Sequence, residues 1–241
     1  MKARLQGALQ STLGFRRYLY WFALFKIRTL RWDRKERDFR HVLSLVGSDA
    51  IVLDIGANVG IMTALLGRRC SQGTVHAFEP TPENIDTLRR VIRRLRLSNV
   101  RLHELALGDR EGEVEMVMPE KDRLRMQGLS HVVQEGVRMA DSGRRYRVPV
   151  RRLDDLEAVA RGVDAIKIDV ENYEHRVLLG GRETLRKFRP LIYCELWSNE
   201  NREKCFSLLQ GELGYAVKVL VNGELVEFQR DEHDKQNFFF V

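Results

Sequence analysis

The chain has 241 residues, of which 44% are hydrophobic and 31% are charged, with 18 Gly and 5 Pro. This balance excludes disordered, collagen-like and repeat-array chains, and it allows one full hydrophobic core or two small ones. The net charge is +7, but residues 1–40 hold 11 basic and 3 acidic side chains, which leaves 30 basic and 31 acidic side chains elsewhere. The basic excess is therefore a property of the N-terminal segment.

Residues 1–45 are predicted to be helical, with basic residues between two apolar stripes that repeat at helical spacing. The first stripe is Leu5, Leu9 and Leu13, and the second follows Gly14. The longest apolar run, residues 18–25, is shorter than the roughly 18–20 residues of a membrane span, and no small-residue cleavage site follows it. Two interpretations stay open: an interfacial helix on an anionic membrane, or a helix that caps the core and pairs subunits.

From residue 51 the sequence alternates between short apolar runs and helical segments, which predicts a doubly wound α/β domain over residues 46–241. The apolar runs show little polar alternation, as is typical of buried parallel strands. We expect strands at 51–56, 74–80, 99–107, 164–170 and 190–197, and helices at 59–69 and 83–96.

Two regions depart from this alternation. Residues 215–221 and 236–241 are separated by a polar stretch that contains Asn222 and Gly223, which predicts antiparallel strands at the edge of the sheet. Short strand-like segments with a polar loop also lie between the third and fourth strands. We expect residues 119–147 to form an insertion that shapes the binding site of a substrate.

The strongest local motif is DIGANVG at 54–60, in which an apolar strand runs into a glycine turn and then into a helix. Gly56 and Gly60 allow close approach of a ligand to the backbone, and the helix start offers free N–H donors. Asn58 replaces the middle glycine of a dinucleotide fingerprint, which disfavours a pyrophosphate ligand. Asp54 on this turn suits a cationic aminoacyl ligand such as S-adenosylmethionine, with a purely structural turn as the alternative.

Glu79 lies at the end of the second strand, about 20 residues after the glycine turn, where nucleotide-binding α/β domains place the carboxylate that binds ribose hydroxyls. Pro80 then turns the chain outward. At the end of the third strand, Ala106 and Leu107 are predicted to line an adenine pocket, with Asp109 as a further contact, although Gly-Asp pairs are also common turn formers.

The segment KIDVENYEH at 167–175 delivers Asp169 and Glu171 to the carboxyl edge of the fourth strand, where α/β domains bind their ligands. Glu195 ends the fifth strand in the same way. Lys167 is interpreted as the partner of a neighbouring carboxylate. His131 lies in the insertion, and its ordinary pKa suits a general base, with a structural loop histidine as the alternative.

The motifs DIGANVG, AFEPTPEN, LALGD, RRLDDL, IKIDVEN and RPLIYCE, in this order, resemble the FkbM-type family of S-adenosylmethionine-dependent methyltransferases. The resemblance covers about residues 50–200, with the closing NFFFV also similar. It implies a class I methyltransferase (Rossmann-like) sheet of about seven strands and methylation of a hydroxyl on a glycan, lipid-linked or secondary-metabolite acceptor. Carried over by position, residues 54, 56, 58 and 60 form the first cofactor motif and Glu79 is the ribose ligand. Where the family has a glycine after KIDVE, this chain has Asn172.

An alcohol needs a base to accept its proton during methyl transfer, and we expect Asp169 or Glu171 to serve, with His131 as the outsider. The alternatives are an N-methyltransferase, a NAD-linked oxidoreductase, and a membrane-associated binding module without catalysis. No cysteine spacing suggests a zinc site, and no metal is required by the spacing of the carboxylates. We expect a cytoplasmic protein that binds no nucleic acid, with membrane contact through residues 1–40 and homodimerisation left open.

Overall fold

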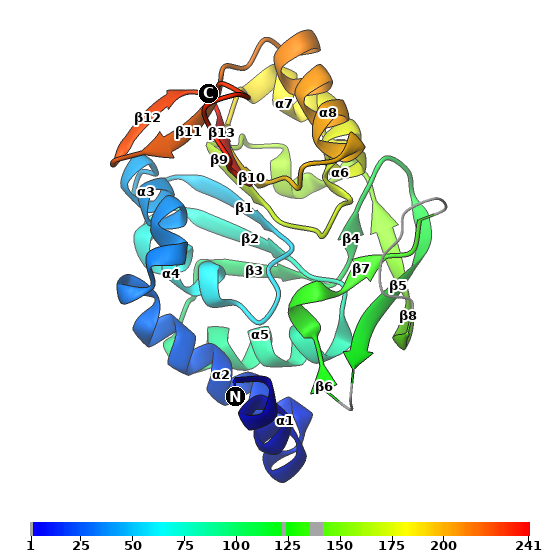
Figure 1. The fold of residues 1–241 in the computed structure, drawn as a ribbon. Helices are drawn as coiled ribbons and strands as arrows, with labels where there is room; N and C mark the ends of the chain where they lie inside the picture. Colours follow the sequence, from blue (N-terminus) through cyan, green and yellow to red (C-terminus); the bar gives the residue numbers. More distant parts are fainter. Residues whose placement is uncertain (1, 122–123, 135–141) are drawn as a thin grey trace.

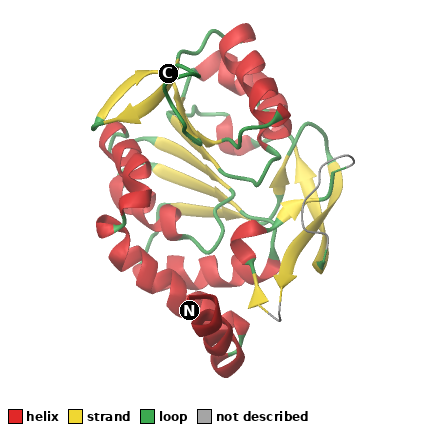
Figure 2. Ribbon diagram, viewed as in Figure 1, coloured by secondary structure: helices red, strands yellow, loops and turns green. Residues whose placement is uncertain are grey.

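The structure, a computed structural model, describes residues 2–121, 124–134 and 142–241. Its centre is an eight-stranded sheet in the order β12-β11-β13-β10-β9-β1-β2-β3 with helices on both faces, as Figures 1 and 2 show. The predicted doubly wound α/β architecture is confirmed. The strands of the central sheet are β1 (Ile51–Ile55), β2 (Thr74–Phe78), β3 (Val100–His103), β9 (Ala165–Ile168), β10 (Leu191–Glu195), β11 (Val217–Val221), β12 (Glu224–Glu227) and β13 (Asn237–Phe240).

The five strands from β3 to β10 pair in parallel, whereas β13, β11 and β12 pair antiparallel, as the tail of the sequence predicts. The sheet has one strand more than expected. Asn222 and Gly223 form a two-residue turn with φ angles of 52° and 97°, which joins β11 directly to β12. Such a turn closes a tight hairpin, so the polar stretch after residue 221 contributes an additional edge strand.

Helices from both halves of the chain cover the two faces of the central sheet. One face packs against α2 (Phe15–Thr29), α3 (Arg37–Leu45), α4 (Ile61–Arg69) and α5 (Pro82–Leu95). The other face packs against α6 (Glu174–Gly180), α7 (Arg182–Phe188), α8 (Glu200–Phe206) and the π-helix Ser207–Glu212. Successive residues of a strand face opposite sides of the sheet. In β1, Val52 packs toward the helices of the first face, and Leu53 and Ile55 pack toward those of the second face.

The expected strand at 99–107 is divided between two sheets. β3 ends at His103, and β4 (Ala106–Leu107) joins a second sheet with β5 (Gly112–Lys121), β6 (Leu124–Arg125), β7 (His131–Val132) and β8 (Gly143–Arg151). This second sheet stands beside the carboxyl ends of β1, β2 and β9 (Figure 1). The predicted acceptor-shaping insertion at 119–147 falls partly within it, and its residues 122–123 and 135–141 lie outside the described residues.

A buried carboxylate ties the second sheet to α5. Glu83, in the first turn of α5, accepts hydrogen bonds from Arg144 Nη1 at 2.7 Å and from the Tyr146 hydroxyl at 2.8 Å. Burial, followed by the hydrogen bond to Glu83, holds the pKa of Tyr146 above its ordinary value, so this phenol keeps its proton. Charge-assisted bonds of this kind are about twice as strong as neutral ones, and they fix β8 against the helix that follows β2.

The N-terminal segment is helical, as predicted. α1 (Lys2–Leu13) and α2 meet at Gly14, whose φ of 73° lets the chain reverse, and the short 3₁₀ turns Leu30–Trp32 and Arg34–Glu36 lead into α3. Phe39 of α3 packs on Tyr193 of β10, so this helix shares the hydrophobic core of the sheet. The division of the chain at residue 45 stays a prediction. Among the described residues, no helix is long and apolar enough to cross a membrane.

Candidate functional site

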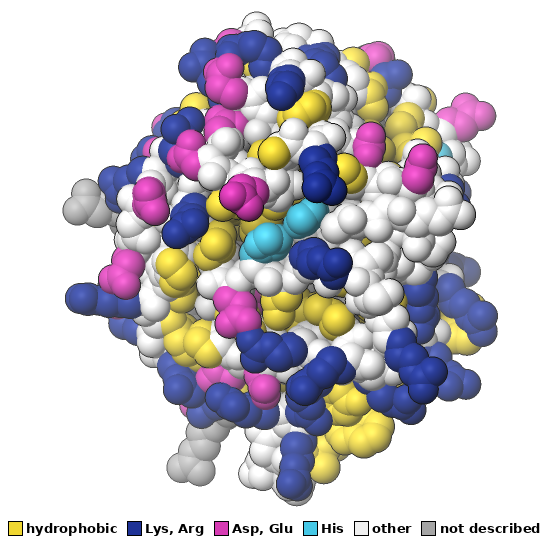
Figure 3. All heavy atoms as spheres, turned by 180° about the vertical axis from the view of Figure 1, so that it is seen from behind, with side chains coloured by type: hydrophobic (Ala, Val, Ile, Leu, Met, Phe, Trp, Pro, Cys, Tyr) yellow, Lys and Arg dark blue, Asp and Glu magenta, His cyan; other side chains and the backbone are white. Residues whose placement is uncertain are grey.

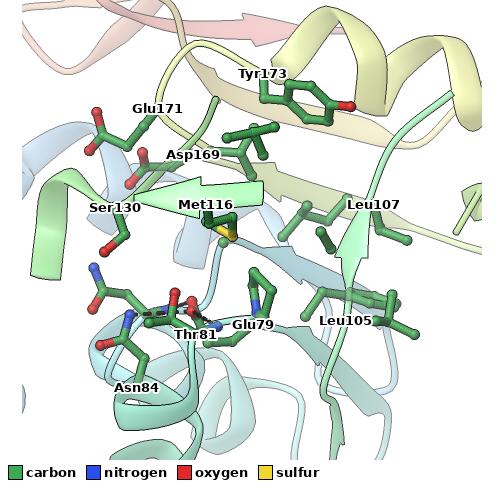
Figure 4. Close-up of a pocket in the computed structure, with 18 of the residues that line it drawn as sticks. Glu79, Thr81, Asn84, Leu105, Leu107, Met116, Ser130, Asp169, Glu171 and Tyr173 are labelled. Carbon is green, nitrogen blue, oxygen red and sulfur yellow. Dashed lines mark hydrogen bonds between the residues drawn. The ribbon is translucent and has the colours of Figure 1, made fainter. Parts of the chain in front are cut away.

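A pocket opens between the carboxyl edge of the central sheet and the second sheet (Figure 4). One end is apolar, with Leu105 and Leu107, and the other carries Asp169, Glu171 and Ser130. Eight of the predicted site residues line the pocket. They are Gly56, Asn58, Glu79, Pro80, Ala106, Leu107, Asp169 and Glu171.

The glycine turn after β1 forms the floor of the pocket. Gly56 has a φ of 78°, and a Cβ atom built on it would lie 1.9 Å from the carbonyl oxygen of Asp169. Only glycine therefore fits at this position, both for its backbone angle and for the close approach of β9. The N–H groups of Gly56 and Ala57 both donate to the Phe78 carbonyl, which ties the turn to the end of β2.

Glu79 stands at the end of β2 with its carboxylate buried and held by three donors. Oε2 accepts from the Asn58 backbone N–H at 2.8 Å, and Oε1 accepts from the Thr81 N–H at 2.8 Å and from Asn84 Nδ2 at 3.2 Å. Burial raises the pKa of Glu79, and these hydrogen bonds oppose the rise. A carboxylate has about four acceptor positions, so one position on Oε2 remains for a ligand hydroxyl.

Lys167 of β9 lies beneath the glycine turn and is 3% exposed. Its Nζ donates to the Gly56 carbonyl at 2.9 Å and lies 3.4 Å from Asp54 Oδ1 and 3.8 Å from Asp169 Oδ2. Burial acts to lower the pKa of Lys167, but the two carboxylates outweigh it and raise the pKa overall. The predicted pairing of Lys167 with a neighbouring carboxylate is thus present in the structure.

Acidic side chains gather above Lys167 at the carboxyl ends of β9 and β10. Burial raises the pKa of Glu171 to about 8, and the negative charges of Asp169 and Glu195 add to the rise. Burial and Asp169 together raise the pKa of Glu195 to about 7, with Lys167 opposing. Burial also raises the pKa of Glu36, which precedes α3; the charge of Lys26 opposes this rise, and the charges of Asp33 and Asp169 add to it.

The loop that carries Glu171 is held in an uncommon conformation. Glu171 and Asn172 have φ angles of 52° and 73°, a region in which asparagine is tolerated better than most residues. Glu174 stabilises this loop, since its Oε1 accepts from the N–H groups of Val170 and Asn172, and its Oε2 accepts from Asn201 Nδ2 at 2.6 Å. The side chain of Glu171 is thereby presented to the pocket (Figure 4).

Four predicted site residues lie outside the pocket lining. Asp54 is fully buried below the turn, where Thr63 Oγ1 donates to it at 2.6 Å, so it supports the turn from beneath and does not line the pocket. Gly60 caps α4 and packs against Leu88, because a Cβ atom there would lie 2.3 Å from Leu88 Cδ1.

The other two residues are Asp109 and His131. Asp109 pairs with Arg176 at 2.6 Å between Oδ2 and Nη1, which explains its place in the loop after β4. His131 is 2% exposed, and its Nδ1 donates to the Leu129 carbonyl at 2.9 Å, so the ring is packed within β7. The interpretation of His131 as a structural loop histidine fits these surroundings better than its interpretation as a base in the pocket.

The sequence reasoning missed several residues that shape the pocket. Two of them, Asn84 and Thr81, belong to the turn and helix that follow Glu79, and Asn84 lies three residues after Thr81 at the start of α5. Asn84 Oδ1 and Asn58 Oδ1 are buried polar atoms with no hydrogen-bond partner among the described residues. Buried polar atoms are normally paired, so these two oxygens are unsatisfied acceptors on residues that line the pocket. Within residues 2–121, 124–134 and 142–241, no group of three or more His, Cys, Asp or Glu side chains is arranged to hold a metal ion.

Comparison with known proteins gives a family for this arrangement. Residues 54–232 match the sequence profile described as Methyltransferase FkbM domain. The 2-O-methyltransferase NoeI of Sinorhizobium fredii is 30% identical over 171 residues, which cover 67% of this chain and 69% of that protein. The 31-O-demethyl-FK506 methyltransferase FkbM of Streptomyces tacrolimicus is 33% identical over 165 residues, covering 58% of this chain and 62% of that protein.

Solved structures share the fold. A methyltransferase FkbM from Methylobacillus flagellatus superimposes with a TM-score of 0.55 at 17% identity, over 81% of this chain and 44% of that one. An O-methyltransferase from Bacillus cereus, solved with S-adenosylhomocysteine (SAH), gives a TM-score of 0.50 at 14% identity over 99% of this chain and 96% of that one. The fold is therefore that of class I methyltransferases, while the chain spans less than half of the Methylobacillus protein.

Lys167→Met is expected to lower the free energy of unfolding by about 3–5 kcal/mol, because it leaves the fully buried Asp54 without its cation. Chemical denaturation at pH 7 measures the change. Lys204→Met is the matched control, since Lys204 pairs with the exposed Glu200 on α8, and its loss is expected to change stability by less than about 0.5 kcal/mol. Equal effects of the two substitutions would contradict the role given to Lys167.

Proposed function

Because the chain belongs to the FkbM methyltransferase family, we propose that it transfers a methyl group from S-adenosylmethionine to a hydroxyl of a small-molecule or glycan acceptor. The observation that carries this proposal is the carboxylate of Glu79, buried at the end of β2 and fixed by three donors in a pocket at the carboxyl edge of the sheet. A fixed carboxylate at this place is what a ribose needs for its hydroxyls.

The residues of the pocket fit S-adenosylmethionine in three respects. Glu79 and the unpaired Oδ1 atoms of Asn58 and Asn84 are acceptors for the ribose hydroxyls and for an amino group. Leu105, Ala106 and Leu107 give an apolar surface for adenine. The acidic group around Asp169 and Glu171 favours a ligand that carries positive charge, such as a sulfonium with an α-amino group.

S-Adenosylmethionine, when bound, supplies a methyl group on a positively charged sulfur. The chain must then align the acceptor oxygen and accept the proton of its hydroxyl. Glu171 is the base that the geometry favours, because it lines the pocket beside Asp169 and its pKa of about 8 lies close to physiological pH. Asp169 lies 3.8 Å from Lys167 Nζ, and we assign it the role of positioning the acceptor or the amino group of the donor.

The type of acceptor is supported by the relatives. NoeI is described as a 2-O-methyltransferase, and FkbM is described as a methyltransferase of 31-O-demethyl-FK506. Transfer to oxygen is therefore proposed over transfer to nitrogen. Contact with the acceptor is assigned to four residues that line the pocket from the second sheet and its connections, Met116, Gln127, Ser130 and Val132. A glycan, a lipid-linked molecule and a secondary metabolite remain the candidate acceptor classes.

Isotope-labelled S-adenosylmethionine, incubated with the protein and a host extract, tests the proposed reaction. Label in the lipid, glycan or small-molecule fraction, absent with Glu79→Ala, would support it and narrow the acceptor class. Label confined to protein or RNA would contradict the proposed acceptor. A NAD-linked oxidoreductase is the alternative if the protein binds NAD and fails to bind SAH.

Glu79→Gln is expected to weaken the binding of SAH about 10- to 100-fold, because it removes a charged acceptor and turns an amide N–H₂ toward one of three donors. Isothermal titration calorimetry measures the affinity. Glu104→Gln is the control, as Glu104 is exposed and paired with Arg89. Unchanged affinity in Glu79→Gln, with the control also unchanged, would remove Glu79 from the binding site.

Glu171→Gln is expected to lower kcat by about 100-fold or more, while the affinity for SAH changes little. In the unmodified protein, the ionised form of Glu171 is the base, so kcat/KM should rise about tenfold per pH unit below pH 8 and level off above it. In Glu171→Gln this dependence should disappear. A profile of kcat/KM that is flat between pH 6 and 9 would exclude Glu171 as the base.

A further inference from the structure

The hairpin of α1 and α2 presents an apolar surface to solvent. Trp21, Phe25 and Trp32 are 61%, 65% and 63% exposed, and Leu9 and Leu13 of α1 flank them. These side chains border a groove of about 810 Å³ between the two helices. Large apolar side chains exposed together are uncommon on soluble monomers, and they mark a surface that meets another partner.

Basic side chains are interleaved with these aromatic ones. Arg17, Trp21, Phe25 and Arg28 follow one another at spacings of four, four and three residues, so they share one face of α2. Both arginines are exposed. Figure 3 shows dark-blue Lys and Arg side chains around an apolar patch at the lower edge of the molecule, the end at which α1 and α2 lie in Figure 1.

The acidic residues of this segment do not neutralise that face. Asp33 pairs with Lys26 at 2.6 Å, Glu36 is partly buried with Lys26 as its main cation, and Asp38 is half-buried near Lys235. The exposed charges of residues 14–37 are therefore basic. They belong to Arg16, Arg17, Arg28, Arg31, Arg34, Lys35 and Arg37.

We propose that the α1–α2 hairpin docks onto the surface of an anionic lipid bilayer. Trp21, Phe25 and Trp32 enter the headgroup region, and Arg17 and Arg28 contact anionic headgroups, which is the pattern of an interfacial helix. A second copy of the chain fits this face less well, because a symmetric dimer would bring two cationic faces together. An extended nucleic acid fits less well too, since residues 41–241 carry 30 basic and 31 acidic side chains.

Docking in this way would hold the candidate pocket near the lipid surface. Gln10 of α1 exchanges two hydrogen bonds of 3.1 Å with the backbone of Arg125 in β6, and Gln127, two residues further, lines the pocket. The hairpin is thus bonded to the wall of the pocket. A lipid-linked acceptor could then reach the pocket without leaving the bilayer surface.

Co-sedimentation with vesicles tests the proposal without requiring activity. The full chain is expected to bind vesicles of phosphatidylcholine with 30% phosphatidylglycerol, and to bind pure phosphatidylcholine vesicles at least about tenfold more weakly. Added salt should release it. The variant Trp21→Ser/Phe25→Ser/Trp32→Ser and the variant Arg17→Glu/Arg28→Glu should each bind anionic vesicles about tenfold or more weakly. Circular dichroism establishes that both variants remain folded.

The control is Leu45→Ser/Val241→Ser, which removes two exposed apolar side chains away from the hairpin and should leave vesicle binding unchanged. In Trp32→Phe/Trp197→Phe, Trp21 is the remaining tryptophan, and its emission should shift to the blue on anionic vesicles. Three results would overturn the proposal. The first is that the unmodified chain does not bind anionic vesicles, and the second is that both hairpin variants bind them as strongly as the unmodified chain. The third is that the unmodified chain does not bind vesicles, and the hairpin variants lose a dimer or the binding of a single-stranded oligonucleotide.

Discussion

The buried ammonium group of Lys167 is the point on which the candidate site depends. It lies between β1 and β9, donates to the Gly56 carbonyl and has Asp54 and Asp169 within 4 Å. A charge in the protein interior is tolerated only when it is paired and hydrogen-bonded, so the positions of these groups are linked. The same ammonium thereby fixes the glycine turn, the buried Asp54 and the carboxylate that faces the pocket.

The raised pKa values at the carboxyl edge of the central sheet follow from an excess of acidic over basic side chains there. Asp169, Glu171 and Glu195 lie near Lys167, and burial makes the loss of each proton from Glu171 and Glu195 unfavourable near neutral pH. A cationic ligand would relieve this repulsion by supplying positive charge where protein cations are few. The raised pKa values and the preference for a cationic donor thus have one origin.

The sequence predicted the parts of the site that are set by local pattern. Gly56, Asn58 and Glu79 lie in the pocket as expected, since a glycine turn and a strand-end acid follow from chain order alone. Tertiary packing decides the remaining positions. Asp54 and Gly56 lie two residues apart in one motif, yet Asp54 is buried below the pocket with Thr63 and Lys167, whereas Gly56 belongs to the turn that lines it.

Other omissions have the same cause. The charge of Asp169 acts on the pKa of Glu36, which lies more than 130 residues away in sequence, and no local pattern indicates that proximity. The segment 99–107 has the length and pattern of one continuous strand, so its sequence could not show that β4 leaves the central sheet to pair with β8. The prediction of His131 as a base rests on its residue type, whereas its backbone partner and its burial depend on the second sheet.

The division of the pocket between two sheets has an evolutionary consequence. The floor comes from the ends of β1, β2 and β9, whereas Met116, Gln127, Ser130 and Val132 come from the second sheet and its connections, which extend from β4 to β8. This sheet is one continuous stretch of the gene, attached to α5 through Glu83. Mutation or exchange of that stretch can therefore diversify what the protein accepts, while the elements that underlie the chemistry are inherited unaltered.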